Sequence, residues 1–139
     1  MVDAQQNVKK DRPVYRNIGL AQLVKYRLPW AGKVSILHRI SGAVLFLLLP
    51  FILYLFDQSI ASEVSYQKFQ AFTSGVLVKV VCLGLIWCFL HHFCAGIRYL
   101  LLDLEIGVEK SESNRSAIIV LVVGIALTAV VGLKLFGLY

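Results

Sequence analysis

The stretch SILHRISG, residues 35–42, places Ser35, His38 and Arg39 where a long apolar run begins. Polar groups at the entrance to a lipid bilayer cost free energy, and in membrane proteins they usually mark a functional site. On a helix, Ser35 and Arg39 share a face that His38 borders. Arginine offers a fixed positive charge and serine a hydroxyl, so the pattern predicts a pocket at headgroup depth for an anionic or carbonyl-bearing ligand. The structural alternative is that all three bond only backbone or headgroups.

A second polar cluster, HHFCAGIRYLLLD, covers residues 91–103. At 100° per residue, one face of a helix over this stretch carries His92, Gly96, Tyr99 and Asp103. A glycine one turn from His92 would leave room beside the imidazole, as a flat macrocycle lying against the helix needs. His91 points about 100° away and shares its face with Arg98. His91 and His92 therefore cannot both ligate one metal from the same side.

Two interpretations of His92 stay open. A single histidine inside a membrane is often an interhelical hydrogen-bonding residue rather than a ligand. The glycine, together with a second polar cluster on another helix, makes haem ligation an equal alternative. A six-coordinate haem needs two axial ligands, and the chain offers His92 with His38, or His92 with a histidine of another subunit. The sequence carries no dinucleotide fingerprint, P-loop, nucleophile elbow or zinc-protease motif that would favour a self-contained enzyme.

The elements that position these residues are expected to be membrane-spanning helices. Hydrophobic residues make up 58% of the chain, charged residues 16%, and the mean hydropathy is +0.75, which is outside the range of soluble domains. Three runs without Lys, Arg, Asp or Glu cover residues 40–56, 80–97 and 116–133. At about 1.5 Å per residue, each approaches the roughly 30 Å of hydrocarbon in a bilayer.

We therefore predict an all-α membrane protein with three transmembrane helices preceded by a short cytoplasmic interfacial segment. The predicted parts are a segment over residues 1–32, with a short helix among its proline and glycine breakers, and a three-helix anchor over residues 33–139. The predicted spans are about 34–56, 76–102 and 116–138. A kink is expected at Pro50 in the first span, and close helix packing at Gly124, Thr128 and Gly132 in the third.

The basic residues predict the orientation. Eight of the fourteen lie before the first span, namely Lys9, Lys10, Arg12, Arg16, Lys25, Arg27, Lys33 and Arg39. By the positive-inside rule, the N-terminus is cytoplasmic. Asp3 and Asp11 argue against a mitochondrial transit peptide, which favours a bacterial inner membrane. The net charge of +6 then reflects topology and contact with lipid headgroups rather than nucleic acid. The cysteines Cys82, Cys88 and Cys94 are expected to be packing residues.

Taken together, SILHRISG, HHFCAGIRYLLLD and the upstream pair Arg12–Pro13 resemble the cytochrome b subunit of succinate dehydrogenase, from about Arg12 to the C-terminus. The resemblance implies a membrane anchor that works with a second hydrophobic anchor, an iron–sulfur subunit and a flavoprotein. It implies that electrons from succinate reach ubiquinone, with a haem b nearby. The anchor would contribute to a respiratory complex II without binding succinate itself.

The resemblance also implies roles for single residues. His92 falls on the family's axial haem ligand, with the second ligand supplied by the partner anchor. Ser35 and Arg39 fall on quinone-binding positions, and His38 with Arg39 falls near the haem propionates. Tyr99 stands where the family often has a histidine, so the role of that histidine is not carried over to this chain, and His91 has no assigned role.

Three alternatives remain beside this interpretation. The first is a relative that reduces fumarate or uses menaquinone. The second is a structural anchor or assembly protein without functional haem, which would tolerate loss of His92. The third is a small transporter, for which acidic residues would be expected within the membrane; the three apolar runs contain none.

Overall fold

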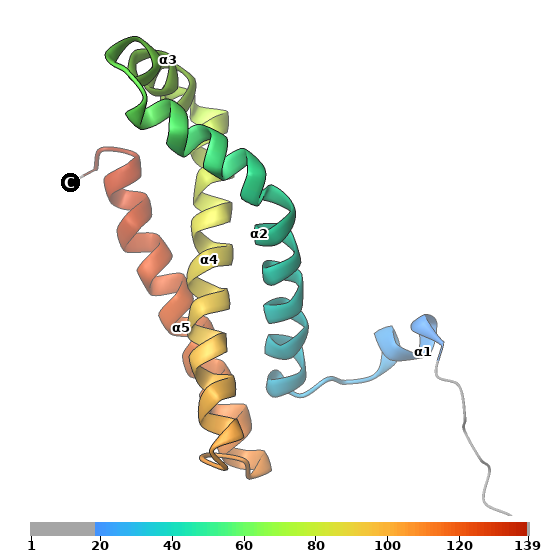
Figure 1. Cartoon of the computed structure of the whole chain (residues 1–139). Helices are drawn as coiled ribbons and strands as arrows, with labels where there is room; N and C mark the ends of the chain where they lie inside the picture. Colours follow the sequence, from blue (N-terminus) through green and yellow to red (C-terminus); the bar gives the residue numbers. More distant parts are fainter. Residues whose placement is uncertain (1–18, 139) are drawn as a thin grey trace, which may run out of the picture.

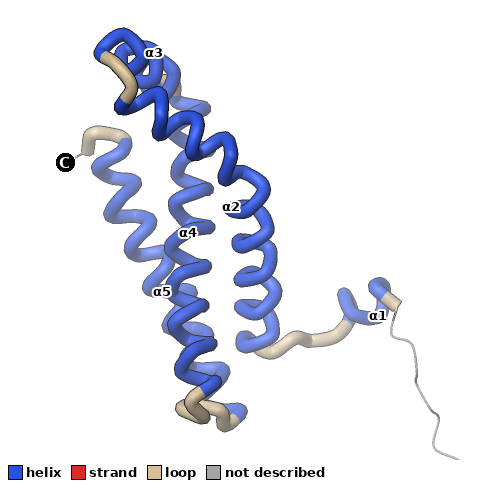
Figure 2. The backbone as a smooth tube through the Cα atoms, viewed as in Figure 1, coloured by secondary structure: helices blue, strands red, loops and turns tan. Residues whose placement is uncertain are grey.

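The computed structural model of the chain describes residues 19–138, and this part is built from helices joined by short connections (Figure 1, Figure 2). The elements in chain order are α1 (Leu20–Lys25), α2 (Trp30–Ile60), α3 (Glu63–Ser74), α4 (Val76–Asp103) and α5 (Lys110–Leu135). Three of them, α2, α4 and α5, are long and apolar enough to cross a membrane. The predicted all-α architecture with three spans is confirmed.

Two helix starts differ from the predicted spans. The first long helix begins at Trp30, directly after Pro29, whose backbone is extended at the N-cap. A proline fits the start of a helix because its missing N–H has no intrahelical partner there. α5 begins at Lys110, so its first turn consists of polar residues that precede the apolar run. Hydropathy identifies the part of each helix that is apolar enough to lie in the hydrocarbon. The helices α2 and α5 both begin several residues before that part.

The N-terminal segment is described from Gly19 onward. It contains the six-residue helix α1, which lies off the end of the bundle where α2 begins (Figure 1). The predicted segment 1–32 is therefore described only in part. The Arg12–Pro13 pair and four of the eight basic residues before the first span, Lys9, Lys10, Arg12 and Arg16, lie outside the described residues.

The first long helix is bent along its length (Figure 1) and contains Pro50. A proline inside a helix cannot donate to the carbonyl four residues earlier, here that of Phe46, and its ring crowds that carbonyl. This is a sufficient physical cause for the bend. The lower part of α2 therefore packs along α4, while its upper part leans toward α3.

The bundle is held by small residues rather than by a large apolar core. Its buried core consists of Val34, Ala95, Ala117 and Val120, and large apolar side chains face outward from all three long helices. Lipid tails are as apolar as these side chains, so close backbone approach replaces hydrophobic burial as the source of helix association. Gly124 lies against the backbone of His91, since a Cβ there would be 3.7 Å from its Cα. The predicted small-residue face of α5 is confirmed, because Gly124, Thr128 and Gly132 are all buried.

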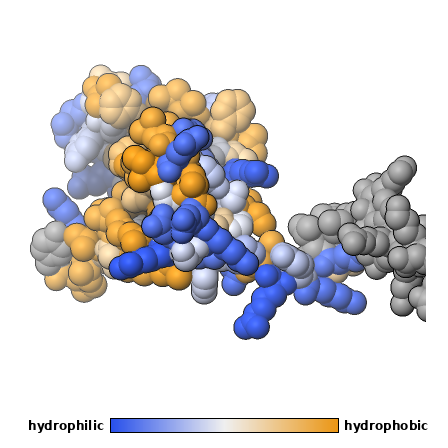
Figure 3. All heavy atoms as spheres, turned by 90° about the horizontal axis from the view of Figure 1, so that it is seen from below, coloured by the Kyte–Doolittle hydropathy of each residue, from blue (hydrophilic) through white to orange (hydrophobic). Residues whose placement is uncertain are grey.

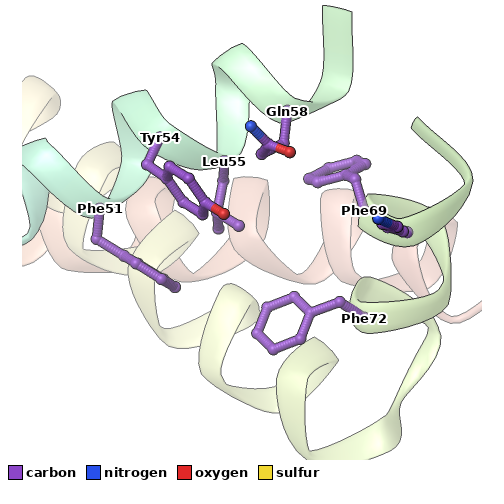
Figure 4. Close-up of a pocket in the computed structure, with 7 residues that line it drawn as sticks. Phe51, Tyr54, Leu55, Gln58, Phe69 and Phe72 are labelled. Carbon is purple, nitrogen blue, oxygen red and sulfur yellow. The ribbon is translucent and has the colours of Figure 1, made fainter. Parts of the chain in front are cut away.

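The connection after the first span, which has no predicted helix, contains α3. Ser62 caps α3 reciprocally with Ser65: its Oγ accepts from the backbone N–H of Ser65 at 3.2 Å, and its own N–H donates to the Ser65 Oγ at 3.0 Å. A pocket of about 250 Å³ lies between α2 and α3, with Phe51, Tyr54, Phe69 and Phe72 around it (Figure 4). It lies at the opposite end of α2 from the polar residues 35–42, so it is separate from the predicted site.

Candidate functional site

His92 lies where α4 packs against α2, and the backbone of α2 holds its ring. Its Nδ1 is 3.0 Å from the carbonyl oxygen of His38 and 3.3 Å from the Oγ of Ser41. The Ser41 hydroxyl donates to the same carbonyl at 2.9 Å. Because a carbonyl can only accept, we assign a proton to Nδ1 of His92.

This assignment leaves the second ring nitrogen of His92 as an acceptor. Nε2 makes no hydrogen bond to any residue that the structure describes. An imidazole whose Nδ1–H is fixed by a backbone carbonyl, with a free lone pair on Nε2, is the form in which histidine binds metals. The donor set therefore fits a metal-bearing cofactor at Nε2.

Glycine at position 42 allows the His92 ring to approach α2 this closely. A Cβ at Gly42 would lie 2.7 Å from Cε1 and 3.1 Å from Nδ1 of His92. Gly96, predicted to lie beside the His92 imidazole, faces His38 instead, because a Cβ there would lie 3.9 Å from the His38 Nε2. The His38 ring, which stacks on His92, occupies this space, and room for a cofactor at Gly96 stays a prediction. Ser41 and Gly42 belong to the first polar stretch, three and four residues after His38, and were missed.

Replacing Gly42 with alanine should therefore destabilise the protein, whereas the same change at Gly96 should not. The new methyl group at position 42 forces the His92 ring to move, and such overpacking costs about 1–3 kcal/mol. At position 96 the methyl group makes an ordinary contact. Thermal unfolding of both variants in mild detergent tests this pair. An unchanged midpoint for Gly42→Ala would mean that the His92 ring is not held against α2.

The ring of His38 stacks on that of His92. Their centroids are 4.2 Å apart with an interplanar angle of 15°, and the Tyr99 ring lies 5.1 Å from His38 on the other helix. Two axial ligands of one iron approach it from opposite faces of the macrocycle, whereas these two rings lie face to face. His38 therefore does not oppose His92 as a second ligand in this arrangement.

Ser35 and Arg39 lie on the flank of α2, beside the face that packs on α4. Ser35 is half-buried and Arg39 is exposed, and neither side chain hydrogen-bonds to any of residues 19–138 in the structure. Their separation of four residues puts both on one side of the helix. A hydroxyl and a guanidinium therefore stand free next to the histidine pair, with bonding capacity for a ligand. Their functional roles remain predictions.

His91 points away from this site, as its angular offset from His92 predicts. It is completely buried between α4 and α5, and its ring stacks on Trp87 with centroids 5.2 Å apart. Neither of its ring nitrogens has a hydrogen-bond partner among the described residues. His91 and His92 therefore do not face a common ligand.

Arg98 shares the face of His91 and joins α4 to α5. Its Nε donates to the Ser116 Oγ at 2.9 Å, and its Nη2 donates to the carbonyl oxygen and Oγ of Ser113 at 3.0 and 2.8 Å. Asn114 on the same helix accepts from the backbone N–H of Ala31 at 3.1 Å. The start of α5 thus ties the same end of all three spans together. The sequence signal for this role was a set of short polar residues at the start of α5.

The fold and the site together define a multi-pass helical membrane subunit with a histidine pair between two spans near one end. A scan against family models matches residues 9–131 to the succinate dehydrogenase/fumarate reductase transmembrane subunit. The match covers most of the chain, which therefore belongs to this family. The family predicted from the two polar motifs is confirmed, and the chain is a membrane-anchor subunit of the succinate dehydrogenase complex.

Curated relatives give the same result. The chain is 37% identical over 102 residues to the succinate dehydrogenase cytochrome b556 subunit of Coxiella burnetii, a match covering 73% of this chain and 82% of the relative. It is 26% identical over 128 residues to the protein of that name from Rickettsia felis, covering 92% and 96% of the two chains. For the Paracoccus denitrificans protein of that name, the values are 27% over 114 residues, covering 82% and 87%.

Proposed function

We propose that this chain is the cytochrome b anchor of a bacterial succinate:ubiquinone oxidoreductase. In this proposal His92 is one axial ligand of a haem b and a second hydrophobic anchor subunit supplies the other. Ser35 and Arg39 form part of the ubiquinone-reduction site, and a flavoprotein and an iron–sulfur subunit complete the complex. The observation that carries the proposal is the His92 ring, fixed through Nδ1 and free at Nε2.

The surroundings of His92 favour haem over plain packing. A haem b, when bound, accepts and passes on single electrons. The chain contributes the backbone carbonyl of His38, which orients the ligand ring and raises its basicity. Arg39 offers a fixed positive charge and His38 a ring nitrogen for acidic groups at the edge of such a cofactor. The cytochrome b556 names of the relatives agree with this assignment.

The geometry of the histidines supports a ligand from a second anchor subunit. His38 is stacked on His92, His91 is stacked on Trp87 of its own helix, and the chain contains three histidines in all. None of the other two opposes His92, so the remaining axial position needs a group from outside this chain. This favours the second of the alternatives that the sequence left open.

The ubiquinone site is proposed on the free flank of α2. The Ser35 hydroxyl can donate to a quinone oxygen, and the Arg39 guanidinium stabilises the negative charge that develops as the quinone is reduced. The exposure of Arg39 leaves its donors available to a ligand that enters from the membrane.

The orientation is proposed with the N-terminus in the cytoplasm of a bacterial cell and the chain in the inner membrane. Seen from the end where α2 begins, hydrophilic side chains gather over the end of the bundle and hydrophobic ones surround it (Figure 3). Lys33, Arg39, Lys110 and Arg115 belong to this end of the long helices. An excess of Lys and Arg near the ends of spans favours the cytoplasmic side.

The test is to purify the complex through a tag on this chain in mild detergent. We expect four subunits, succinate-driven quinone reduction and a sharp low-spin b-type band in the dithionite-reduced minus oxidised visible spectrum. An intact four-subunit complex without a haem band would show that the histidine pair only packs. The chain would then be an anchor without haem.

A further inference from the structure

Arg98 is a buried cation whose protein partners are neutral. Its side chain is 5% exposed, and within residues 19–138 it bonds to two serine hydroxyls and one carbonyl through Nε and Nη2, with the Tyr99 ring centroid 5.5 Å from Cζ. No carboxylate belongs to this set of described partners. Burying a guanidinium without a counter-ion is unfavourable, because hydroxyls compensate only part of the lost hydration of the charge. The position therefore favours an anion supplied from outside the described chain.

A pocket of about 290 Å³ lies beside this guanidinium, between the end of α4 and the start of α5. Its polar lining comes from Arg98, Glu112, Arg115 and Ser116. Two arginines and one glutamate give the lining a net charge of +1 (2 − 1). Arg115 is exposed, so its donors are available to a ligand in this pocket.

The rest of the lining is apolar, with Leu101, Leu102, Ile106 and Ile119 among its residues. A soluble anion gains nothing from such walls, whereas an amphiphile can place its charged group on the arginines and its acyl chain along the leucine and isoleucine side chains. Basic pockets between membrane helices are a known setting for anionic lipid headgroups. Arginine pairs suit a phosphate group because each guanidinium donates in a planar fork.

The depth of the pocket agrees with this ligand. Arg98 lies five residues before the end of α4 at Asp103, or roughly 7.5 Å along the helix. Ser116 lies near the start of the uncharged part of α5. Both residues therefore stand near the boundary between the hydrocarbon and the headgroups, where a lipid phosphate is found.

We propose that this pocket binds one anionic phospholipid, with its phosphate on Arg98 and Arg115 and an acyl chain along the apolar wall. The bound lipid neutralises the pocket and joins α4 to α5 together with the two serines. The proposal uses none of the haem or quinone residues, although the Tyr99 ring lies between the two sites, 5.5 Å from Arg98 Cζ and 5.1 Å from the His38 ring.

The test uses the purified four-subunit complex, stripped of lipid in detergent and titrated with phosphatidylglycerol while native mass spectrometry counts bound lipid. Arg115→Gln should weaken binding of the first lipid about fivefold, the effect expected for one arginine near the membrane surface. Lys110→Gln is the matched control, because Lys110 lies at the same end of α5 but does not line the pocket. It should leave the first binding event unchanged.

Two further titrations, with phosphatidylcholine and with inorganic phosphate, test which ligand the pocket binds. Phosphatidylcholine, which carries its own cation, should bind more weakly than phosphatidylglycerol, and inorganic phosphate should not displace the bound lipid. Equal loss of binding in Arg115→Gln and Lys110→Gln would reduce the effect to general surface charge and overturn the site. Wild-type binding by Arg115→Gln, or displacement by inorganic phosphate alone, would overturn it as well. Arg98→Lys keeps the charge without the fork and should also bind less lipid; unchanged binding there would contradict the role of Arg98.

Discussion

The complex carrying His92→Ala should lose its b-type haem band while its subunits still assemble. Alanine has no ring nitrogen, so the axial position that Nε2 is proposed to fill would be empty. The carbonyl of His38 would lose its donor from α4 but keep the Ser41 hydroxyl at 2.9 Å. The measurement is the dithionite-reduced minus oxidised spectrum of the purified complex. The height of the haem band is divided by the flavin content, so that it reports haem per complex. We expect most of the low-spin band to disappear or shift.

The neighbouring residue provides the control for this experiment. His91→Leu removes an imidazole one position away and replaces it with an apolar side chain of similar size at a completely buried position beside Trp87. Its haem spectrum should match that of the wild type. If His92→Ala kept an unchanged haem band in an assembled complex, the ligand would lie elsewhere. Loss of the band in both variants would indicate a general packing defect rather than ligation.

The sequence contained enough information for the three spans but not for the connections between them. Apolar runs mark the hydrocarbon core because each uncharged stretch of that length fits one crossing. The helix α3 was missed because Glu63–Ser74 is neither apolar nor strongly periodic, and its capping pair, Ser62 and Ser65, is a weak local signal. A proline before the first span predicts a break in the chain, and in the structure Pro29 is the N-cap of that helix.

Relations along one helix were predictable, whereas contacts between helices were not. The 100° step separates His91 from His92 and aligns His91 with Arg98, and the structure agrees. The partner of a given face depends on how each helix is rotated and shifted against its neighbours, which periodicity does not specify. For this reason Gly42, rather than Gly96, was found against His92. The hydrogen bonds from Arg98 to Ser113 and Ser116 join two helices, so they could not be predicted from periodicity either.

Loss of the Arg39 charge should slow ubiquinone reduction more than any other single change on the flank of α2. Arg39→Leu is expected to lower succinate-driven ubiquinone reduction by about 100-fold, the effect of removing one donor aimed at developing negative charge. Ser35→Ala removes a neutral hydrogen bond and should cost about tenfold. Each variant is also assayed with a soluble dye that takes electrons before the quinone. Dye reduction should remain at the wild-type rate.

Three matched variants separate chemistry from local structure. Lys33→Gln removes a cation at the same end of α2, where the Lys33 ammonium lies 4.2 Å from the Trp30 ring centroid, and should leave quinone reduction unchanged. Arg39→Lys keeps the charge without the planar fork and should fall between the wild type and Arg39→Leu. Ser35→Thr keeps a hydroxyl and should recover most of the rate lost in Ser35→Ala. If Ser35→Ala and Arg39→Leu both reduced quinone at the wild-type rate in assembled complex, the quinone would bind elsewhere, and the free flank of α2 would serve only contact with lipid headgroups.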